Sequence, residues 1–420
     1  MQTSLEAISN KARREKKYRF RNLYRVINAE FLHESWKRLN KRAAPGIDKI
    51  DYDEYSKNIV ENINKLAEKL KEKRYRAKLV KRLYIDKGNG KQRPLGIPAI
   101  EDKLVQHAVS RILSVIYEQD FYPCSHGYRP NKNGHTAIRE LKHKLNTKRF
   151  RYVVEADIKG FFDNLDHDWL IKMLELRIDD KAFIRLIKKW LRAGVLDTDS
   201  KIIHPVTGSP QGGVASPILA NIYMHHALIL WFERVVKKHC NGKAEIFVYA
   251  DDFICVFENK RNAERFYRVL GKRLGKFNLL LSEDKTKIID FRLDSKSSFD
   301  FLGFTFQWSH RQRYKTLIVR TSRKNFKRSY ESFKEWLKLN RHLKKKIFFK
   351  QLNMKLRGYY NYYGIKGNSK GIGKFDYLII KQLFKWLNRR SQKRSYYWKG
   401  FMETIRHFKM VRCKIIWLNF

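Results

Sequence analysis

The chain has 420 residues, of which 43% are hydrophobic and 14% aromatic, enough to build the cores of two or three packed domains. Its 91 lysines and arginines outnumber 42 aspartates and glutamates, which gives a formal net charge of +49. A charge of this size predicts a polyanionic partner. No run of 18 or more apolar residues is present, so nucleic acid rather than a membrane is the expected partner.

The four cysteines lie far apart and form no CxxC pair, which argues against a zinc ribbon and against a disulfide framework. The N-terminal segment MQTSLEAISNKARREKKYRF carries basic residues but no apolar stretch with a cleavage site, which argues against secretion. We therefore expect an intracellular protein, cytoplasmic as in bacteria or located in an organelle.

Residues 1–75 show the three- and four-residue spacing of apolar side chains that is typical of helices. The sequence AAPGID interrupts this pattern, and because proline and glycine break helices we expect an ordered loop at 43–51. A hairpin of two strands joined by a GNG turn is expected at 79–98, followed by a helix at 101–117.

Two later apolar segments carry acids where a strand ends. The sequence RYVVEADI at 151–158 predicts a strand that ends near Asp157. The sequence EIFVYADDFICVF at 245–257 predicts a hairpin with Asp251 and Asp252 at its tip.

The composition changes after FDFLGFTF at 299–306. From there the chain is strongly basic, with aromatic residues interleaved in a helical pattern. We therefore expect a domain boundary near residue 310.

Adjacent aspartates in a buried hairpin repel each other unless a cation lies between them. If the two acid-bearing segments share one sheet, Asp157, Asp251 and Asp252 converge at one edge and offer the oxygen ligands that Mg²⁺ prefers. Two such ions, about 3.5 to 4 Å apart, would activate a 3′-hydroxyl and neutralise departing pyrophosphate, which is nucleotidyl transfer. The alternative is that the aspartate pair only fills an exposed turn. The surrounding residues favour the metal site.

YADD at 249–252 resembles the signature of reverse transcriptases, in the form common in group II intron enzymes. Residues 351–364, QLNMKLRGYYNYYG, are similar to the maturase or thumb region of the same proteins, and RRSQKRSYYW resembles the end of that region. Other segments stand along the chain in the order of this family: AAPGID (43–48), RPLGIP (93–98), SHGYRP (125–130), DIKGFFD (157–163), SPQGGVASP (209–217), SEDKTK (282–287) and FLGF (301–304).

The resemblance implies a right-hand polymerase of mixed α/β (α+β) class, with fingers and palm on an antiparallel sheet and a helical thumb. Residues 1–75 would form an N-terminal extension and the start of the fingers, and 76–310 the fingers and palm. Residues 311–395 would form the thumb or maturase domain, and 396–420 a short basic C-terminal segment. We expect no endonuclease domain, because paired cysteines and an HExxH motif are absent.

By the same resemblance, Asp157, Asp251 and Asp252 are the expected catalytic ligands of two Mg²⁺ ions, for which Mn²⁺ can substitute. Phe162 is the expected aromatic gate beneath the incoming sugar, because a bulky ring there excludes a ribose 2′-hydroxyl. The alternative is that Phe161 and Phe162 both lie in the core, and Phe161 is the one that we expect there.

Further residues are expected to contact the dNTP. Lys91 and Arg93 follow the glycine turn, where they can neutralise the triphosphate, and Gln211 lines the nucleotide. Lys285 is expected at the triphosphate or the primer–template, with a solvated lysine as the alternative.

A packing role competes with RNA binding in the thumb, because Leu352, Leu356, Tyr359 and Tyr363 fall on one stripe of a helix. We expect about half of the thumb aromatic residues to pack rather than bind. The residues expected to contact nucleic acid carry charged, aromatic or glycine groups suited to phosphates and bases: Arg129, Gly212, Lys344, Lys345, Lys346, Arg357 and Tyr360.

The expected function is that of an RNA-directed DNA polymerase of group II intron type, which also binds intron RNA and assists splicing and mobility. Its partners would be an RNA template, a DNA primer, dNTPs and the intron RNA; no protein partner is indicated. One alternative is an RNA-binding splicing maturase with vestigial polymerase activity. Another is a domesticated reverse transcriptase that serves DNA repair or phage defence.

Overall fold

The computed structural model divides by packing into two compact units. The first comprises Met1–Asn133, Ala156–Cys255 and Arg261–Lys287, and the second Gly134–Glu155, Val256–Lys260 and Ile288–Phe420. The residues that the structure describes are 2–86, 92–197, 202–203, 207–208, 212–309, 315–390 and 395–416.

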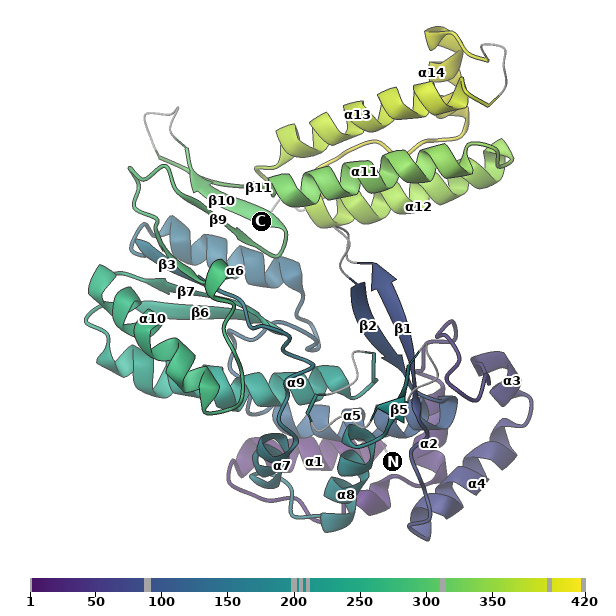
Figure 1. Cartoon of the computed structure of the whole chain (residues 1–420), viewed down its shortest axis with the longest axis vertical. Helices are drawn as coiled ribbons and strands as arrows, with labels where there is room; N and C mark the ends of the chain where they lie inside the picture. Colours follow the sequence, from purple (N-terminus) through teal and green to yellow (C-terminus); the bar gives the residue numbers. More distant parts are fainter. Residues whose placement is uncertain are drawn as a thin grey trace. The chain divides into compact units, whose positions relative to one another are not determined.

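The first unit is organised around α5 (Ile100–Tyr117), a helix with buried side chains on most of its faces. Its bounds agree with the helix predicted at 101–117. The helices α1 (Gln2–Arg14), α2 (Ala29–Trp36) and α9 (Ser216–Met224) pack against it (Figure 1). Further helical segments of this unit include η1 (Tyr24–Val26), α3 (Tyr52–Ser56), α4 (Ile59–Lys71), α7 (His167–Glu175), α8 (Lys181–Leu191), α10 (Lys260–Gly275) and η5 (Glu283–Lys285).

Short polar side chains fix where several of these helices begin. Asn28, Asp51, Asp166 and Asp180 each accept a hydrogen bond from a backbone N–H in the first turn of α2, α3, α7 and α8, respectively. The residues before Asp51 form a loop without helix or strand, so the loop predicted at 43–51 is confirmed.

The predicted hairpin at 79–98 is present as β1 (Val80–Asp86) and β2 (Gln92–Ile97), which pair antiparallel. Its GNG turn lies outside the described residues. Two short strands extend this sheet: β4 (Val195–Leu196) pairs in parallel with β1, and β5 (Ile202–Ile203) pairs antiparallel with β4.

A second sheet has the order β6-β7-β3-β8, formed by β6 (Ala244–Tyr249), β7 (Asp252–Phe257), β3 (Tyr152–Ala156) and β8 (Lys287–Asp290). The Arg151 N–H donates to the Phe257 carbonyl, so the start of β3 lies beside the end of β7 and these two strands run antiparallel. The strands predicted within 151–158 and 245–257 are thus confirmed.

Beyond α9 the chain continues through two π-helical turns, η2 (His225–Ile229) and η3 (Phe232–Val236), and a 3₁₀ turn, η4 (Lys237–His239). Wider turns disturb the regular backbone hydrogen bonds of a helix. The guanidinium of Arg273 donates to the carbonyls of His226 and Ala227, which satisfies part of this segment.

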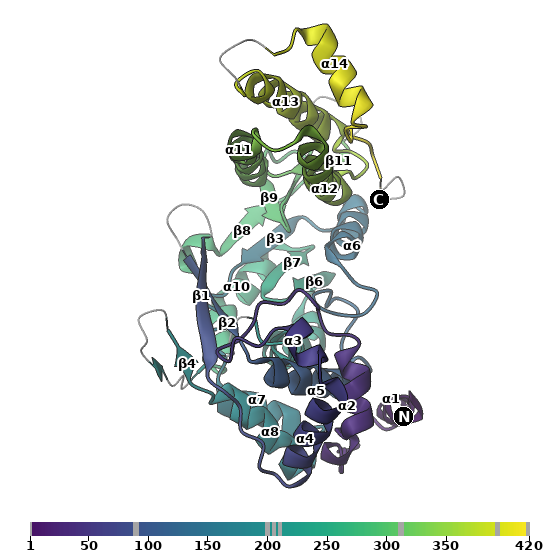
Figure 2. The ribbon, with the colours of Figure 1, turned by 90° about the vertical axis from the view of Figure 1, so that its right-hand side faces the viewer.

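The second unit contains a three-stranded antiparallel sheet and a group of long helices. The sheet consists of β9 (Ser298–Phe301), β10 (Phe304–Trp308) and β11 (Leu317–Thr321). The helices are α6 (Gly134–Asn146), α11 (Arg323–Asn340), α12 (Lys345–Tyr363), α13 (Ser369–Leu387) and α14 (Trp398–His407), of which α11, α12 and α13 lie side by side (Figures 1 and 2).

The boundary predicted near residue 310 falls between β10 and β11, two strands that pair along their length. Leu317–Thr321 is still a strand, with the alternating burial typical of a half-buried strand. The helical region begins only after it, at Arg323. The mixed α/β class is confirmed. Among the described residues no helix is long and apolar enough to cross a membrane.

Candidate active site

Asp251 and Asp252 lie at the connection between β6 and β7. Ala250, which precedes them, is buried and has a φ of +57°, an uncommon value for a residue with a side chain. Asp252 is the first residue of β7 and is exposed, whereas Asp251 is half-buried. Asp157 follows the last residue of β3, and since β3 and β7 are antiparallel neighbours, it lies at the same end of the sheet as Asp252.

Lys285 contacts this group of acids directly. Its ammonium nitrogen lies 2.6 Å from Oδ2 of Asp157. The segment is also held by its backbone, because the Ser282 N–H donates to the Asp157 carbonyl. The structure thus places Lys285 at the predicted acids, while its contact with a nucleotide remains a prediction.

The three carboxylates offer oxygen ligands of the kind that Mg²⁺ prefers. The ammonium on Asp157 shows that positive charge is favourable at this end of the sheet. Within the part of the chain that the structure describes, however, no group of three or more His, Cys, Asp or Glu side chains lies close enough together to hold an ion. The donor chemistry therefore fits a divalent cation, and the close approach of the three acids stays a prediction.

Phe162 is half-buried, and its ring centroid lies 5.4 Å from that of Phe161 in an edge-to-face arrangement. Phe161 is 2% exposed, which confirms its predicted core position. Gly208, with a φ of +95°, lies against the turn that carries Phe162: a side chain there would come 2.8 Å from the Asp163 carbonyl. The backbone of this turn is therefore closely packed.

The buried Asp102 of α5 holds the segment before β1. It accepts hydrogen bonds from the Tyr75 hydroxyl and, at 3.0 Å, from the Lys78 N–H, and Trp190 donates to the same tyrosine oxygen at 2.9 Å. Burial raises the pKa of Asp102 to about 6. The sequence analysis missed this role, although a charged EDK triplet at the start of a largely apolar helix was a usable signal.

Two further polar residues of α5 hold loops that carry the predicted motifs. Lys103, 6% exposed, donates to the Ala44 carbonyl in the AAPGID loop. Gln106, also 6% exposed, accepts from the Val214 N–H at 2.9 Å in the segment that follows Gln211. One helix face thus fixes loops that are far apart in the sequence.

Several predicted nucleotide contacts lie outside the described residues. These are Lys91, Gln211 and the side chain of Arg93. Gly212 is exposed, with a φ of +118°, and a side chain there would come 2.6 Å from the Gly96 carbonyl. Close contact with the backbone at Gly96 therefore explains why position 212 is a glycine. The contact of Gly212 with nucleic acid remains a prediction.

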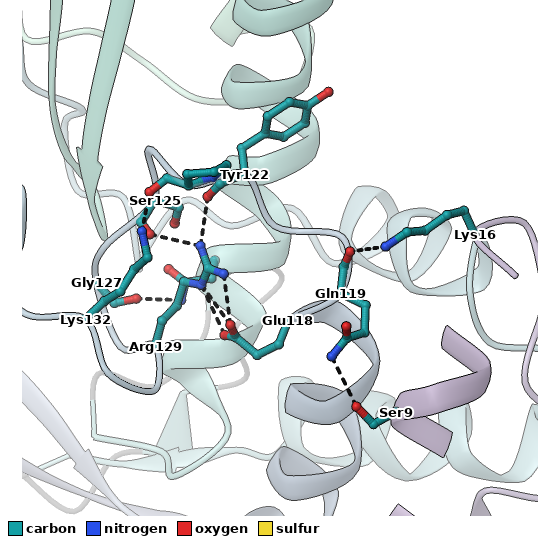
Figure 3. Close-up of polar contacts among 11 residues, drawn as sticks. Ser9, Lys16, Glu118, Gln119, Tyr122, Ser125, Gly127, Arg129 and Lys132 are labelled. Carbon is teal, nitrogen blue, oxygen red and sulfur yellow. Dashed lines mark hydrogen bonds and ion pairs between the residues drawn. The ribbon is translucent and has the colours of Figure 1, made fainter. Parts of the chain in front are cut away.

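The prediction that Arg129 contacts nucleic acid has to be revised. Its side chain is only 7% exposed and forms an ion pair with Glu118 at 2.9 Å (Figure 3). Its guanidinium also donates to the carbonyls of Tyr122 and Ser125. The guanidinium donors of arginine bind buried carboxylates and carbonyls as well as phosphates. The sequence alone therefore could not separate a structural role of Arg129 from a nucleic-acid contact.

Tyr360 is likewise a structural residue rather than an RNA contact. It is 1% exposed, and its hydroxyl donates to the Asp376 carboxylate at 2.7 Å. Tyr359 and Tyr363 are buried too, as the helical stripe predicted. The remaining predicted thumb contacts all have exposed side chains: Lys344, Lys345, Lys346 and Arg357.

Residues 85–306 match the family model described as reverse transcriptase (RNA-dependent DNA polymerase). The match covers more than half of the chain and includes the β6–β7 turn, Asp157 and Lys285. The chain therefore belongs to the reverse transcriptase family.

Its relatives include group II intron-encoded protein LtrA of Lactococcus lactis subsp. cremoris, 41% identical over 226 residues, which are 53% of this chain and 37% of LtrA. Protein YkfC of Escherichia coli K12 is 32% identical over 304 residues, covering 64% of this chain and 80% of YkfC. An uncharacterized 91 kDa protein in the cob intron of Schizosaccharomyces pombe is 37% identical over 207 residues, 49% of this chain and 25% of that protein. This chain thus spans well under two thirds of LtrA.

Proposed function

We propose that this protein is an RNA-directed DNA polymerase of group II intron type. The observation that carries the proposal is the position of Asp157 and Asp252 at one end of one antiparallel sheet, in a chain of the reverse transcriptase family. The 41% identity to a group II intron-encoded protein supports the finer assignment.

Asp157, Asp251 and Asp252 would hold Mg²⁺, with Mn²⁺ as a substitute. Two bound ions would activate the primer 3′-hydroxyl and neutralise the departing pyrophosphate. Lys285, already 2.6 Å from Asp157, would add a positive charge facing the triphosphate.

The other nucleotide contacts are proposed on the same basis. Phe162 would block the 2′-hydroxyl of a ribonucleotide, because its half-buried ring is held by the buried Phe161. Lys91, Arg93 and Gln211 would complete the nucleotide site.

Primer extension tests this proposal. Purified protein is given a poly(rA) template, an oligo(dT) primer, Mg²⁺ and dTTP, beside an Asp251→Ala variant. We expect extension by the unchanged protein and none by the variant. Extension by both proteins would reject the assigned site, and extension by neither over a range of salt would reject the polymerase activity.

We further propose that the second unit binds intron RNA and thereby assists splicing. The exposed Lys344, Lys345, Lys346 and Arg357 support this, because ammonium and guanidinium groups on a helix suit phosphate contacts. Several relatives are named after introns, among them nuclear intron maturase 3 of Arabidopsis thaliana, 29% identical over 129 residues.

Binding of a group II intron transcript at several salt concentrations tests this second proposal. Arg357→Ala is expected to weaken RNA binding and to reduce the slope of the logarithm of the binding constant against the logarithm of the salt concentration by about one. Asp252→Ala serves as the control, because it should abolish DNA synthesis and leave RNA binding and splicing intact. Unchanged binding in Arg357→Ala and in a variant that lacks all three lysines would reject the proposed surface.

A further inference from the structure

A loop of the first unit supports the turn that carries Asp251 and Asp252. The Val248 N–H donates to the Cys124 carbonyl at 2.9 Å, and the His126 N–H donates to the Val248 carbonyl at 2.8 Å. The loop thus pairs with β6 just before the turn. Gly127 then lies against the turn itself: a side chain there would come 2.4 Å from the backbone nitrogen of Ala250. A shift of this loop would therefore move the turn.

Arg129 holds the same loop through an ion pair and hydrogen bonds (Figure 3). Its Nε and Nη2 donate to the Glu118 carboxylate at 2.9 to 3.1 Å. Its Nη1 donates to the carbonyls of Tyr122 at 2.8 Å and Ser125 at 3.0 Å. The guanidinium also lies over the Phe121 ring, 5.2 Å from its centroid. This one side chain therefore ties Glu118, which follows α5, to the backbone at Tyr122 and Ser125, in and next to the residues that pair with β6.

The loop is held on its other side as well. The buried Asn221 of α9 donates to the Gly127 carbonyl at 2.8 Å. Tyr128 has a φ of +55°, an uncommon value for a residue with a bulky side chain, which surrounding contacts have to maintain. The loop is thus held both from Glu118, at the end of α5, and from α9.

We propose that Arg129 and Glu118 are positioning residues, which hold residues 122–127 against the β6–β7 turn and thereby fix Asp251 and Asp252. Arg129 would act through the backbone carbonyls of Tyr122 and Ser125 and not through a contact with substrate. The inference rests on the proposed polymerase function, because only DNA synthesis reports on the position of these acids.

The test compares Arg129→Met and Glu118→Gln with the unchanged full-length protein and with Asp251→Asn. Steady-state primer extension gives kcat and the KM for dTTP, and fluorescence anisotropy gives the Kd for the RNA–DNA primer–template at several salt concentrations. Arg139→Met is the matched control, because Arg139 is an exposed arginine of the second unit.

We expect Arg129→Met to lower kcat about tenfold or more, because misplacement of reacting groups by about 1 Å costs up to about 100-fold. Primer–template Kd and its salt slope should stay unchanged, since no phosphate contact is lost. Glu118→Gln should also lower kcat. Because a glutamate makes no favourable contact with phosphate, such a loss cannot come from a missing phosphate contact. The double variant should be little worse than Arg129→Met, because both changes break one interaction.

Several outcomes would overturn the inference. An unchanged kcat in Arg129→Met would do so, as would a weaker Kd with a smaller salt slope, which marks a phosphate contact. If Arg129→Met does not fold, Gly127→Ala decides, since it leaves the ion pair intact and places a methyl group against Ala250. An unchanged kcat there also rejects the inference. Failure of the unchanged protein to extend the primer would instead reject the proposed function.

Discussion

The ammonium group of Lys285 lies 2.6 Å from Oδ2 of Asp157, so a cation of the chain itself pairs with the carboxylate that is proposed to hold Mg²⁺. Lys285 is exposed, and its long side chain can leave the carboxylate at little cost in burial. We therefore expect the ammonium of Lys285 to leave Asp157 and to pair with the triphosphate when a nucleotide binds.

Replacement of Lys285 by methionine should separate these two interactions. We expect the KM for dTTP to rise by roughly tenfold, because a charge-assisted contact with the triphosphate is lost. The Mg²⁺ concentration that gives half-maximal rate should fall, because the ammonium no longer competes for Asp157. Titrations of dTTP and Mg²⁺ in primer extension measure both, with the exposed Lys276→Met as control. A KM that does not change would show that Lys285 is only a solvated lysine.

A smaller side chain at Phe162 should relax the choice of sugar. Phe162→Val is expected to improve the use of UTP relative to dTTP by roughly tenfold or more, because a hydroxyl then fits where the ring stood. Phe161→Leu is the comparison: Phe161 is buried, so its change should lower stability and alter sugar selectivity much less than Phe162→Val does. The ratio of kcat/KM for the two nucleotides on poly(rA) measures the effect. An unchanged ratio in Phe162→Val would place the gate elsewhere.

The buried hydroxyl of Tyr360 should contribute to stability and not to RNA affinity. Tyr360→Phe leaves the Asp376 carboxylate without one of its donors, so unfolding free energy should fall by about 1 to 3 kcal/mol. Arg412, which also pairs with Asp376 at 2.8 Å, remains to limit the loss. Denaturant unfolding and intron RNA binding are measured in parallel. Weaker RNA binding at unchanged stability would restore Tyr360 as an RNA contact.

The buried carboxyl of Asp102 should make stability depend on pH. Burial raises its pKa from 3.8 to about 6, so ionisation is more costly in the folded state than in the unfolded chain. Its contribution is therefore most favourable below about pH 4, and it declines as pH rises through about 6.

The measurement is denaturant unfolding of the unchanged protein and Asp102→Asn between about pH 4 and about pH 7. Relative to the variant, the unchanged protein should lose on the order of 3 kcal/mol over this range, since each pKa unit corresponds to about 1.4 kcal/mol. If the unfolding free energies of the two proteins change with pH in parallel, folding does not raise the pKa of Asp102.

Local pattern predicted the elements that carry the site. The apolar runs that end at Asp157 and flank Asp251 form strands, because alternating β-branched and aromatic residues suit a pleated, buried surface. The helical stripe in α12 likewise predicted that Tyr359 and Tyr363 are buried.

The sequence did not indicate which tertiary partners the polar side chains have. Nothing local distinguishes Arg129, which pairs with Glu118 inside the fold, from Arg357, which is exposed. The same holds for Tyr360, whose partner Asp376 lies on the next helix. The change from strands to helices was also placed too early, because the pairing of β10 with β11 depends on contacts across a connection and not on local composition.

The most direct test of the central claim is primer extension on an RNA template by Asp157→Asn beside Asp163→Asn. Both changes remove one carboxylate charge from the same segment, but Asp163 is an exposed residue of the turn and is not among the proposed ligands. We predict that Asp157→Asn abolishes DNA synthesis while Asp163→Asn retains it, with equal primer–template affinity in both. Substantial synthesis by Asp157→Asn would contradict the proposal that this chain copies RNA with metal ions held by Asp157, Asp251 and Asp252.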